Sequence, residues 1–352
     1  MKNIKSLDLK SVRRKAVTIS QDEKIEVKQI QLETSIPLVI QPSVQQLNLV
    51  DWARNNRPFI ETQLIQAGGI LFRNFKVKEA AEFEQFMQTI SGKLLKYSYQ
   101  STPRTEVGQN IYTSTEYPAQ LSIPLHNEMS YSRSWPLKIW FFCVKSAESG
   151  GYTPIADSRK VFEGLDPQIK EQFIQKKVMY VRNYSEGLDL PWQRVFQTAN
   201  KSDVEAYCHQ AQIEFEWLEG DRLRTRQICQ AIATHPQTGE QVWFNQAHLF
   251  HLSSLPPKVR ESLLSTFNEE DLPRHAYYGD GSPIEPSVIA QINQVYQQQA
   301  VSFPWQTGDI LMLDNMLTAH GRTPFSGTRK VLVGMAEEFH NQQYLGKETW
   351  LI

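Results

Sequence analysis

Strand-like segments in this sequence fall into two blocks that lie far apart along the chain. The first block spans about residues 110–157 and the second about residues 300–340, with helical patterns between them. Short apolar or alternating runs bounded by Gly, Pro and Asp turns favour β-strands. This distribution is typical of an all-β double sheet, decorated by helices, whose core strands come from distant parts of the chain.

The individual elements follow from the same patterns. Strands are predicted at 68–75, 121–129, 137–144, 309–315 and 329–339. Helices are predicted near 44–66, 78–90, 166–176, 202–219, 256–268 and 286–299. We therefore expect an N-terminal extension (1–40) and a single domain (41–352) that carries a helix-rich insertion at about 160–300.

The composition excludes several classes of function. The chain has 352 residues, of which 40% are hydrophobic and 21% charged, as in globular proteins. A formal net charge of −1 gives no indication of nucleic-acid binding. The longest apolar run, "IWFFCV", is too short to span a membrane, and the N-terminus lacks the features of a signal or transit peptide. Three widely spaced cysteines fit three buried thiols in a reducing cytosol, so we expect a cytoplasmic protein.

The stretch "IPLHNEMSY" (123–131) places a histidine and a glutamate two residues apart. Strand side chains alternate between faces, so His126 and Glu128 are expected to point the same way. Such a pair forms either a hydrogen-bonded surface contact or two legs of a metal site. The pair alone does not decide between the two.

A third metal ligand is available in "DILMLDNMLTAHGR", where His320 follows a hydrophobic strand and its turn. The other histidines stand in polar, helical or turn contexts that favour structural roles. Two histidines and one carboxylate form a facial triad with open positions, which suits non-haem Fe(II). A zinc site with the same ligands is the competing interpretation, although the H-E-x-x-H pattern of zinc peptidases is absent.

Several stretches together resemble one known family. The matching stretches are "YTSTEYP" (112–118), "IPLHNEMSY" (123–131), "GGYTPIADSRKVF" (150–162), "VWFNQAHLFH" (242–251) and "WQTGDILMLDNMLTAHGRTPFSGTRKVLVGMAEEF" (305–339). The chain is similar to the taurine dioxygenase-like, or clavaminate synthase-like, Fe(II)/2-oxoglutarate oxygenases. Within that family it resembles most the branch that includes the syringomycin-pathway aspartyl hydroxylase. The resemblance implies a mainly β fold with helical decoration around a double-stranded β-helix, or jelly-roll, core.

The resemblance also implies roles for five residues. The metal ligands of the family correspond to His126, Glu128 and His320, and the groups that bind 2-oxoglutarate correspond to Thr153 and Arg329. These roles are physically reasonable, because a guanidinium offers a bidentate fork to a carboxylate and a hydroxyl donates one further hydrogen bond.

Other polar residues near the two blocks are candidates for binding the substrate or supporting the ligands. Asn127 would face away from the metal on an ideal strand, and Arg322 would either support the site or pair with Asp314. The candidates for substrate binding are Arg104, Arg182, Tyr184, Asn245 and His248.

The function implied is that of an Fe(II)- and 2-oxoglutarate-dependent dioxygenase. It would use O2 to hydroxylate an unactivated C–H bond of an amino acid or its derivative in natural-product biosynthesis, with release of succinate and CO2. The substrate would be free or presented on a carrier protein. Related halogenases replace the carboxylate ligand with a small residue, so Glu128 argues against halogenation. Desaturation, cyclisation, a non-catalytic metal-binding scaffold and a metal hydrolase are the alternatives, and the sequence does not indicate an oligomeric state.

Overall fold

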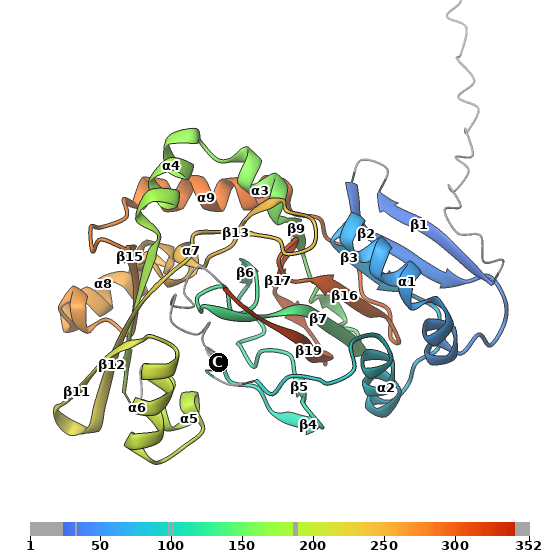
Figure 1. The fold of residues 1–352 in the computed structure, drawn as a ribbon, viewed down its shortest axis with the longest axis horizontal. Coiled ribbons are helices and arrows are strands. Elements are labelled where there is room, and N and C mark those ends of the chain that lie inside the picture. The colour runs from blue at the N-terminus through green and yellow to red at the C-terminus, as the bar shows by residue number, and fades with distance from the viewer. Residues whose placement is uncertain (1–23, 32–33, 98, 100–101, 186–188, 342–352) are drawn as a thin grey trace, which may run out of the picture.

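The computed structural model of the chain describes residues 24–341, apart from 32–33, 98, 100–101 and 186–188. Its strands form a central body, with residues 49–91 supplying helices on one side (Figure 1). Residues 158–299 lie on the other side of that body, where helices surround a second, smaller group of strands (Figure 1).

Eight strands form the largest sheet. They are β1 (Ile25–Gln31), β2 (Thr34–Pro42), β3 (Gly69–Phe72), β4 (Glu106–Gly108), β5 (Ile111–Thr113), β7 (Ser134–Lys145), β16 (Ile310–Asp314) and β19 (Lys330–His340). Their order is β1-β2-β3-β16-β7-β19-β5-β4, and neighbours are antiparallel except for the parallel pair β2 and β3. β7 from the first sequence block therefore lies between β16 and β19 from the second, as the two-block pattern predicts.

Alternate residues of β7 face opposite sides of this sheet. Trp140 and Phe142 share a hydrophobic core with helices α1 (Leu49–Ala67) and α2 (Ala80–Ser91). Phe141 faces the other way, into a core shared with β16 and β19. Because both faces are covered, the strand needs apolar residues at almost every position, which explains its continuous hydrophobic run.

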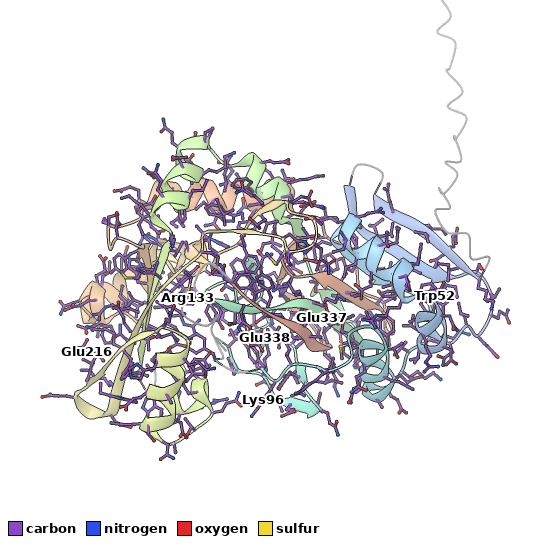
Figure 2. The ribbon with its side chains drawn as sticks, in the orientation of Figure 1. Trp52, Lys96, Arg133, Glu216, Glu337 and Glu338 are labelled. Carbon is purple, nitrogen blue, oxygen red and sulfur yellow. The ribbon has the colours of Figure 1, made fainter. Side chains whose placement is uncertain are left out.

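A buried lysine ties helix α1 to the sheet. The Nζ atom of Lys138 on β7 donates to Glu61 Oε1 on α1 at 2.6 Å and to Glu337 Oε1 on β19 at 2.8 Å. Figure 2 labels Glu337 on β19 and Trp52 on α1, where the indole packs edge-on against Phe72 of β3. Polar and aromatic contacts therefore both fix α1 against the sheet.

Three strands form a second sheet, in the order β6-β17-β9. They are β6 (Ile123–His126), β9 (Ile155–Asp157) and β17 (Thr318–Arg322), and a short pair, β8 (Ser149–Gly150) and β18 (Phe325–Ser326), lies beside them in sequence. The ring of Phe141 on β7 lies 4.9 Å from the imidazole of His320 on β17, so this sheet contacts the inner face of the large one. The expected fold, mainly β with helices around a jelly-roll core, is confirmed.

The segment between β9 and β16 is more than a set of helices. Its helices are α3 (Ser158–Gly164), α4 (Pro167–Lys176), α5 (Trp192–Phe196), α6 (Lys201–Gln210), α7 (Ala247–Phe250), α8 (Pro257–Thr266) and α9 (Pro286–Gln299), with short 3-10 turns at η1 (Glu219–Asp221), η2 (Leu252–Ser254) and η3 (Glu269–Asp271). Its strands are β10 (Val178–Tyr184), β11 (Glu214–Leu218), β12 (Arg222–Cys229), β13 (Ile232–Thr234), β14 (Gln241–Trp243) and β15 (Arg274–Tyr278). Four of them form an antiparallel sheet, β11-β12-β10-β15, so this helix-rich segment also contains strands that the sequence patterns do not predict.

Two expectations are corrected. The helix expected over 202–219 ends at Gln210, and β11 follows because its backbone pairs with β12. The boundary expected at residue 40 falls inside β2, which pairs with β3, so the described residues between 25 and 40 belong to the large sheet. Residues 1–23 of the expected extension lie outside the described residues.

Two observations concern membranes and thiols. None of the helices in the described part of the chain combines the length and apolarity that crossing a membrane requires. Cys143, Cys208 and Cys229 are buried and free, as expected.

Candidate metal centre and co-substrate pocket

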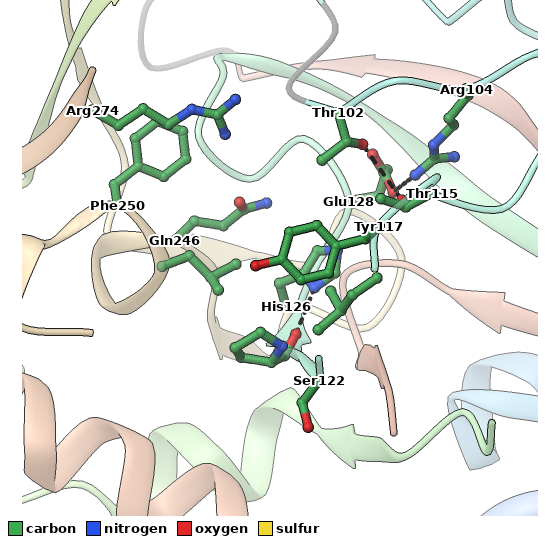
Figure 3. Close-up of a pocket in the computed structure, with 13 residues that line it drawn as sticks. Thr102, Arg104, Thr115, Tyr117, Ser122, His126, Glu128, Gln246, Phe250 and Arg274 are labelled. Atoms are coloured by element: carbon green, nitrogen blue, oxygen red, sulfur yellow. Dashed lines mark hydrogen bonds and ion pairs between the residues drawn. The ribbon is translucent and has the colours of Figure 1, made fainter. Parts of the chain in front are cut away.

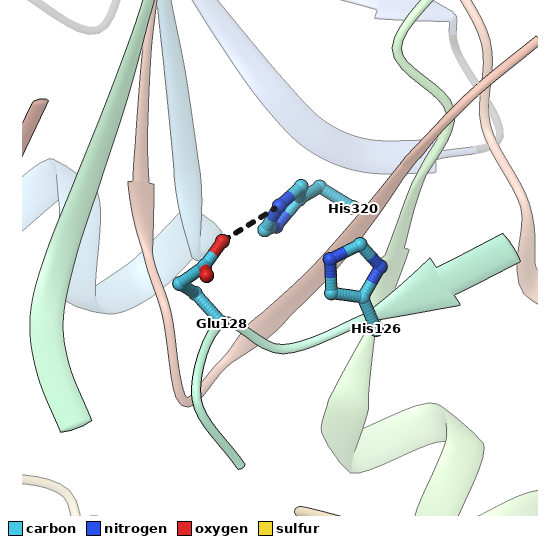
Figure 4. A group of neighbouring side chains, drawn as sticks. All are labelled: His126, Glu128 and His320. Carbon is cyan, nitrogen blue, oxygen red and sulfur yellow. Dashed lines mark ion pairs between the residues drawn. The ribbon is translucent and has the colours of Figure 1, made fainter. Parts of the chain in front are cut away.

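Three side chains with metal-binding atoms converge at the small sheet. His126 ends β6, His320 lies within β17, and Glu128 follows β6 by two residues (Figure 4). One ligand atom from each residue lies within 4.8 Å of the others. β6 and β17 pair with His126 directly opposite His320, and the imidazole rings are 4.6 Å apart. Strand pairing therefore brings together ligands that are far apart in sequence.

Glu128 is positioned by a buried amide rather than by strand alternation, because β6 ends at His126. The backbone N–H of Glu128 donates to Asn315 Oδ1 at 2.7 Å, and Asn315 Nδ2 donates to the carbonyl of Glu128 at 2.9 Å. Asn315 Nδ2 also donates to the carbonyl of Pro136 at 2.8 Å. The expectation that one strand carries both ligands is therefore corrected: the chain turns after His126, and Asn315 holds the turn.

Both histidines are suited to bind a cation in their neutral form. Burial lowers the pKa of His126, although Glu128 opposes this effect, and burial lowers the pKa of His320 well below its usual value. His126 Nδ1 lies 2.8 Å from the carbonyl of Pro124, which assigns the proton to Nδ1 and leaves Nε2 as the lone-pair donor. His320 Nε2 lies 3.9 Å from Glu128 Oε2, and its buried Nδ1 has no hydrogen-bond partner among the described residues. Two neutral imidazoles facing one carboxylate fit a divalent metal ion.

A buried arginine contacts the carboxylate of this group. Arg104 Nη2 donates to Glu128 Oε2 at 2.8 Å, and the two side chains are 4% and 3% exposed. The guanidinium also lies over the ring of Tyr97, 4.5 Å from its centroid. Of the candidates for substrate binding, Arg104 is therefore the one in direct contact with the metal-binding group.

Thr153 and Arg329 line one cavity together with His126 and His320. Thr153 is buried, and its Oγ1 accepts a hydrogen bond from Trp305 Nε1 at 3.0 Å. An indole N–H can only donate, so the hydroxyl proton of Thr153 remains available to an acceptor in the cavity.

Arg329 reaches the same cavity from the loop before β19. Its Nε donates to the carbonyl of Gly151 at 2.9 Å and its Nη1 to Ser114 Oγ at 3.3 Å. Burial, with the nearby Arg322, lowers the pKa of Arg329 to about 10, so the group is still cationic at neutral pH. A half-buried cation held by neutral groups provides a counter-charge for a carboxylate.

Arg322 holds a loop instead of an acidic side chain. The expected pair with Asp314 does not form, because that carboxylate bonds His235. Arg322 donates to three backbone carbonyls, those of Tyr117, Pro118 and Leu121. Its guanidinium thus anchors residues 117–121 beside the cavities.

A second cavity of about 160 Å³, open to solvent, adjoins the first (Figure 3). It shares Arg104, Thr115, Ile123 and His126 with the first cavity. The other residues that line it are Thr102, Tyr117, Ser122, Pro124, Glu128, Gln246, Leu249, Phe250 and Arg274.

The remaining candidates for substrate binding lie outside both cavities as the described residues outline them. Arg182 is buried with its guanidinium over the ring of Tyr184, 4.8 Å from the centroid. Asn245 Nδ2 donates to a backbone carbonyl, and His248 Nε2 lies 2.8 Å from the carbonyl of Leu125. The amide of Asn127 donates to Ser158 Oγ and to the backbone carbonyl of Asn315.

Most of the chain matches one known protein family. The model for "Taurine catabolism dioxygenase TauD, TfdA family" matches residues 34–336. The chain belongs to the TauD/TfdA dioxygenase family. This membership confirms the resemblance found in the sequence, and with it an oxidoreductase that uses Fe(II), 2-oxoglutarate and O2.

Individual members and solved structures agree with the TauD/TfdA assignment. The chain is 42% identical over 278 residues to the dapdiamide synthesis protein DdaC of Enterobacter agglomerans, covering 79% of this chain and 84% of DdaC. It is 27% identical over 299 residues to a clavaminate synthase-like protein of Arabidopsis thaliana, covering 81% and 86%. The structure of PvcB from Pseudomonas aeruginosa aligns with a TM-score of 0.57 at 13% identity, covering 94% of this chain and 98% of PvcB. That last likeness concerns the fold alone.

Several residues of this TauD/TfdA site were not predicted. The sequence gives one indication for Asn315, which is a polar residue directly after the buried strand β16. Gln246, Phe250 and Arg274 line the second cavity from the insertion and carry no distinctive local pattern. Their place depends on how the insertion packs, which spacing along the chain does not indicate.

Proposed function

We propose that the chain binds Fe(II) through His126, Glu128 and His320 and binds 2-oxoglutarate through Thr153 and Arg329. In this role it hydroxylates a C–H bond of an amino acid or an amino-acid derivative. The observation that carries the proposal is that a largely buried group of two histidines and one carboxylate adjoins a cavity lined by the hydroxyl of Thr153 and the half-buried guanidinium of Arg329.

The protein groups position and enclose the reactants. Bound Fe(II) with 2-oxoglutarate and O2 supplies the oxidation of the C–H bond, with release of succinate and CO2. Arg329 and Thr153 orient the distal carboxylate of 2-oxoglutarate by charge-assisted hydrogen bonds. Asn315 and Arg104 fix the backbone and the side chain of Glu128, and Phe141 packs against His320, so the ligands are held before the metal arrives.

A role in natural-product biosynthesis is supported by one relative. The 42% identical DdaC is a dapdiamide synthesis protein, which favours a small-molecule biosynthetic reaction for this chain as well. The open second cavity offers room for a free substrate or for the end of a carrier-bound one. Three free thiols support a cytoplasmic location.

The test uses the protein under anaerobic conditions. Addition of Fe(II) and 2-oxoglutarate should give a visible metal-to-ligand charge-transfer absorbance. His320→Ala should abolish this absorbance. Arg329→Ala should lower the affinity for 2-oxoglutarate, measured by titration of the absorbance, by about 10- to 100-fold, the loss expected for a charged hydrogen-bonding partner. Absence of the band in the unmodified protein, with unchanged 2-oxoglutarate binding in Arg329→Ala, would refute the proposal.

The reaction outcome is read from product mass. Hydroxylation adds one oxygen atom to the substrate for each succinate formed, whereas desaturation or cyclisation removes two hydrogen atoms. A search among amino acids and carrier-loaded aminoacyl groups should therefore show a gain of one oxygen. A product lighter by two hydrogens, with succinate formed in equal amount, would contradict hydroxylation and retain the cofactor assignment.

A further inference from the structure

Positive charge dominates the two cavities. Among the described residues that line them there are four arginines but one carboxylate, that of Glu128. The charge of Arg274 is balanced by Asp189, which does not line the cavities and accepts two hydrogen bonds from this guanidinium. The surplus therefore lies with Arg104, Arg322 and Arg329, three guanidiniums against one carboxylate.

Loading the site does not remove this surplus. An Fe(II) ion carries two positive charges and 2-oxoglutarate two negative charges, so together they add nothing to the net charge. Arg329 and Arg322 lie in the co-substrate cavity and suit the dianion. Arg104 lies at the border between the cavities and remains next to the metal ligand that it contacts. An anion in the second cavity is favoured by this imbalance.

The guanidinium of Arg104 also has donors to spare. Its Nη2 donates to Glu128, but its buried Nε and Nη1 have no hydrogen-bond partner among the described residues. A buried N–H without an acceptor is costly, which indicates that an acceptor arrives with a ligand. The hydroxyls of Thr102 and Thr115 line the same cavity beside it (Figure 3).

The rest of the cavity wall combines apolar and polar side chains. Tyr117, Leu249 and Phe250 supply apolar surface, and Gln246 and Arg274 of the insertion add polar groups. Figure 3 labels Tyr117, Gln246, Phe250 and Arg274 around this space. A ligand that filled this space would place a charged end at Arg104 and an apolar or weakly polar body against these side chains.

We infer that the substrate carries a carboxylate, and that Arg104 receives it beside the metal. This inference rests on the proposed function and specifies its substrate class. Arg104 then links the substrate to Glu128, so one guanidinium positions both. A substrate held on a carrier through a thioester at its α-carboxyl lacks that anion, and it would need another carboxylate at the end that enters the site.

A carboxylate at Arg104 has two sources, the substrate or the metal-binding end of 2-oxoglutarate. Arg104 lines both cavities, whereas Thr153 and Arg329 line only the first. The substrate is favoured because the second cavity, which Arg104 also lines, contains neither of the two groups proposed to bind 2-oxoglutarate. The two sources are distinguished by titrating each ligand separately. A loss in 2-oxoglutarate binding alone on changing Arg104 would assign the carboxylate to the co-substrate and overturn the inference.

The experiment starts from the anaerobic protein loaded with Fe(II) and 2-oxoglutarate. The charge-transfer band is recorded first, so failure of the proposed function is visible before any probe is added. Proteinogenic L-amino acids and their C-terminal amides are then titrated, and each dissociation constant is taken from the perturbation of the band. The series is repeated with Arg104→Gln and Arg104→Lys, and with Tyr117→Phe as a control in the same cavity wall that leaves the charge unchanged.

The expected result is a free acid that binds about 10- to 100-fold more tightly than its amide. Arg104→Gln should abolish that ratio, Arg104→Lys should keep part of it, and Tyr117→Phe should leave it unchanged. Equal binding of acid and amide, or no binding of any acid, overturns the inference. The comparison of acid with amide in the unmodified protein needs no variant, so it tests the substrate carboxylate even if Arg104→Gln does not fold. Arg104→Lys, which retains the charge, then tests whether Arg104 receives that carboxylate.

Discussion

Gly151 occupies a position where a side chain would reach the proposed 2-oxoglutarate site. Its φ is +68°, and a Cβ there would lie 2.9 Å from Arg329 Cδ. Gly151→Ala should therefore displace Arg329 and weaken 2-oxoglutarate binding about tenfold, in addition to losing about 1–2 kcal/mol of stability to backbone strain. Titration of the charge-transfer absorbance and denaturant unfolding measure the two effects.

Gly239 provides the matched control for that substitution. It has a similar φ of +72°, but nothing lies within 4 Å of its ideal Cβ. Gly239→Ala should lose similar stability and keep normal 2-oxoglutarate binding. Equal 2-oxoglutarate affinities in the two variants would contradict the proposed contact between residue 151 and Arg329.

Asn315 determines where the carboxylate ligand lies, through three hydrogen bonds to the backbone of Glu128 and Pro136. Asn315→Ala should weaken Fe(II) binding about 10- to 100-fold, the usual effect of losing a group that orients a metal ligand. Metal titration by calorimetry under anaerobic conditions gives the affinity directly. Asn183→Ala is the control, because Asn183 makes three hydrogen bonds within the insertion. It should lose stability while metal affinity is retained, and a similar loss of affinity in both variants would point to general unfolding.

The segment 117–121 depends on one side chain from β17. Arg322 donates to three of its carbonyls, while Tyr117 and Leu121 are 45% and 46% exposed. Arg322→Met should release the segment and speed chymotrypsin cleavage after Leu121 about tenfold or more, because cleavage follows the open population. The Tyr117–Pro118 bond is not a chymotrypsin site, because proline follows the tyrosine. Leu264 on α8 is equally exposed and serves as the control site in the same digest. Acceleration at Leu264 as well would show that the whole fold had loosened.

Elements with a strong local pattern were predictable. The apolar run of β7 and the helices α4, α8 and α9 lie close to their predicted positions, because both faces of β7 are buried and the helices have clear boundaries. β11 was predicted as helix. Its residues alternate, with Phe215 and Trp217 packed on the core and Glu214 and Glu216 exposed, but five residues are too short a signal against a preceding helical pattern. Pairing with β12 decides the outcome, and that pairing is not local.

The candidate site was predictable to the extent that its residues sit in motifs on core strands. His126, Glu128 and His320 were found as a set, and the structure brings their ligand atoms together. Arg182 and His248 were expected near the substrate but lie outside both cavities, whereas Arg274 lines one. All three belong to the insertion, whose orientation depends on tertiary packing. The sequence therefore predicts the chemistry of the site better than the shape of its substrate cavity.

The insertion and the small sheet of the jelly-roll core share one hydrophobic cluster. The core cluster of the insertion includes Leu125, Ala156 and Ala319 from the small sheet. Cys208 and Cys229 lie in this cluster, while Cys143 lies in the cluster between β7, β16 and β19. The three thiols therefore report on different parts of the molecule.

These thiols predict how stability depends on pH. Burial raises the pKa of Cys143, Cys208 and Cys229 from 9.0 to about 12. Unfolded thiols release protons above about pH 9 while folded ones retain them, so the free energy of unfolding should fall as the pH rises from about 9 to 12. Urea unfolding across this range measures the fall. Replacing all three cysteines with alanine should remove the fall between about pH 9 and 10, where thiols titrate before tyrosines. Part of the fall above about pH 10 should remain, because burial also raises the pKa of tyrosines such as Tyr207 and Tyr296. An unchanged slope between about pH 9 and 10 would contradict buried, protonated thiols.

Because the insertion and the small sheet share this hydrophobic cluster, we expect the insertion and the jelly-roll core to unfold together as one cooperative unit. In the native protein the buried thiols should not react with iodoacetamide at pH 8, because alkylation needs an exposed thiolate. As urea is increased, Cys143 in the large sheet and Cys208 and Cys229 in the insertion should become labelled at the same midpoint, measured by mass spectrometry of their peptides. That midpoint should coincide with the loss of far-ultraviolet circular dichroism. Labelling of the two insertion cysteines at a lower urea concentration than Cys143 would show that the insertion unfolds separately and is a unit of its own.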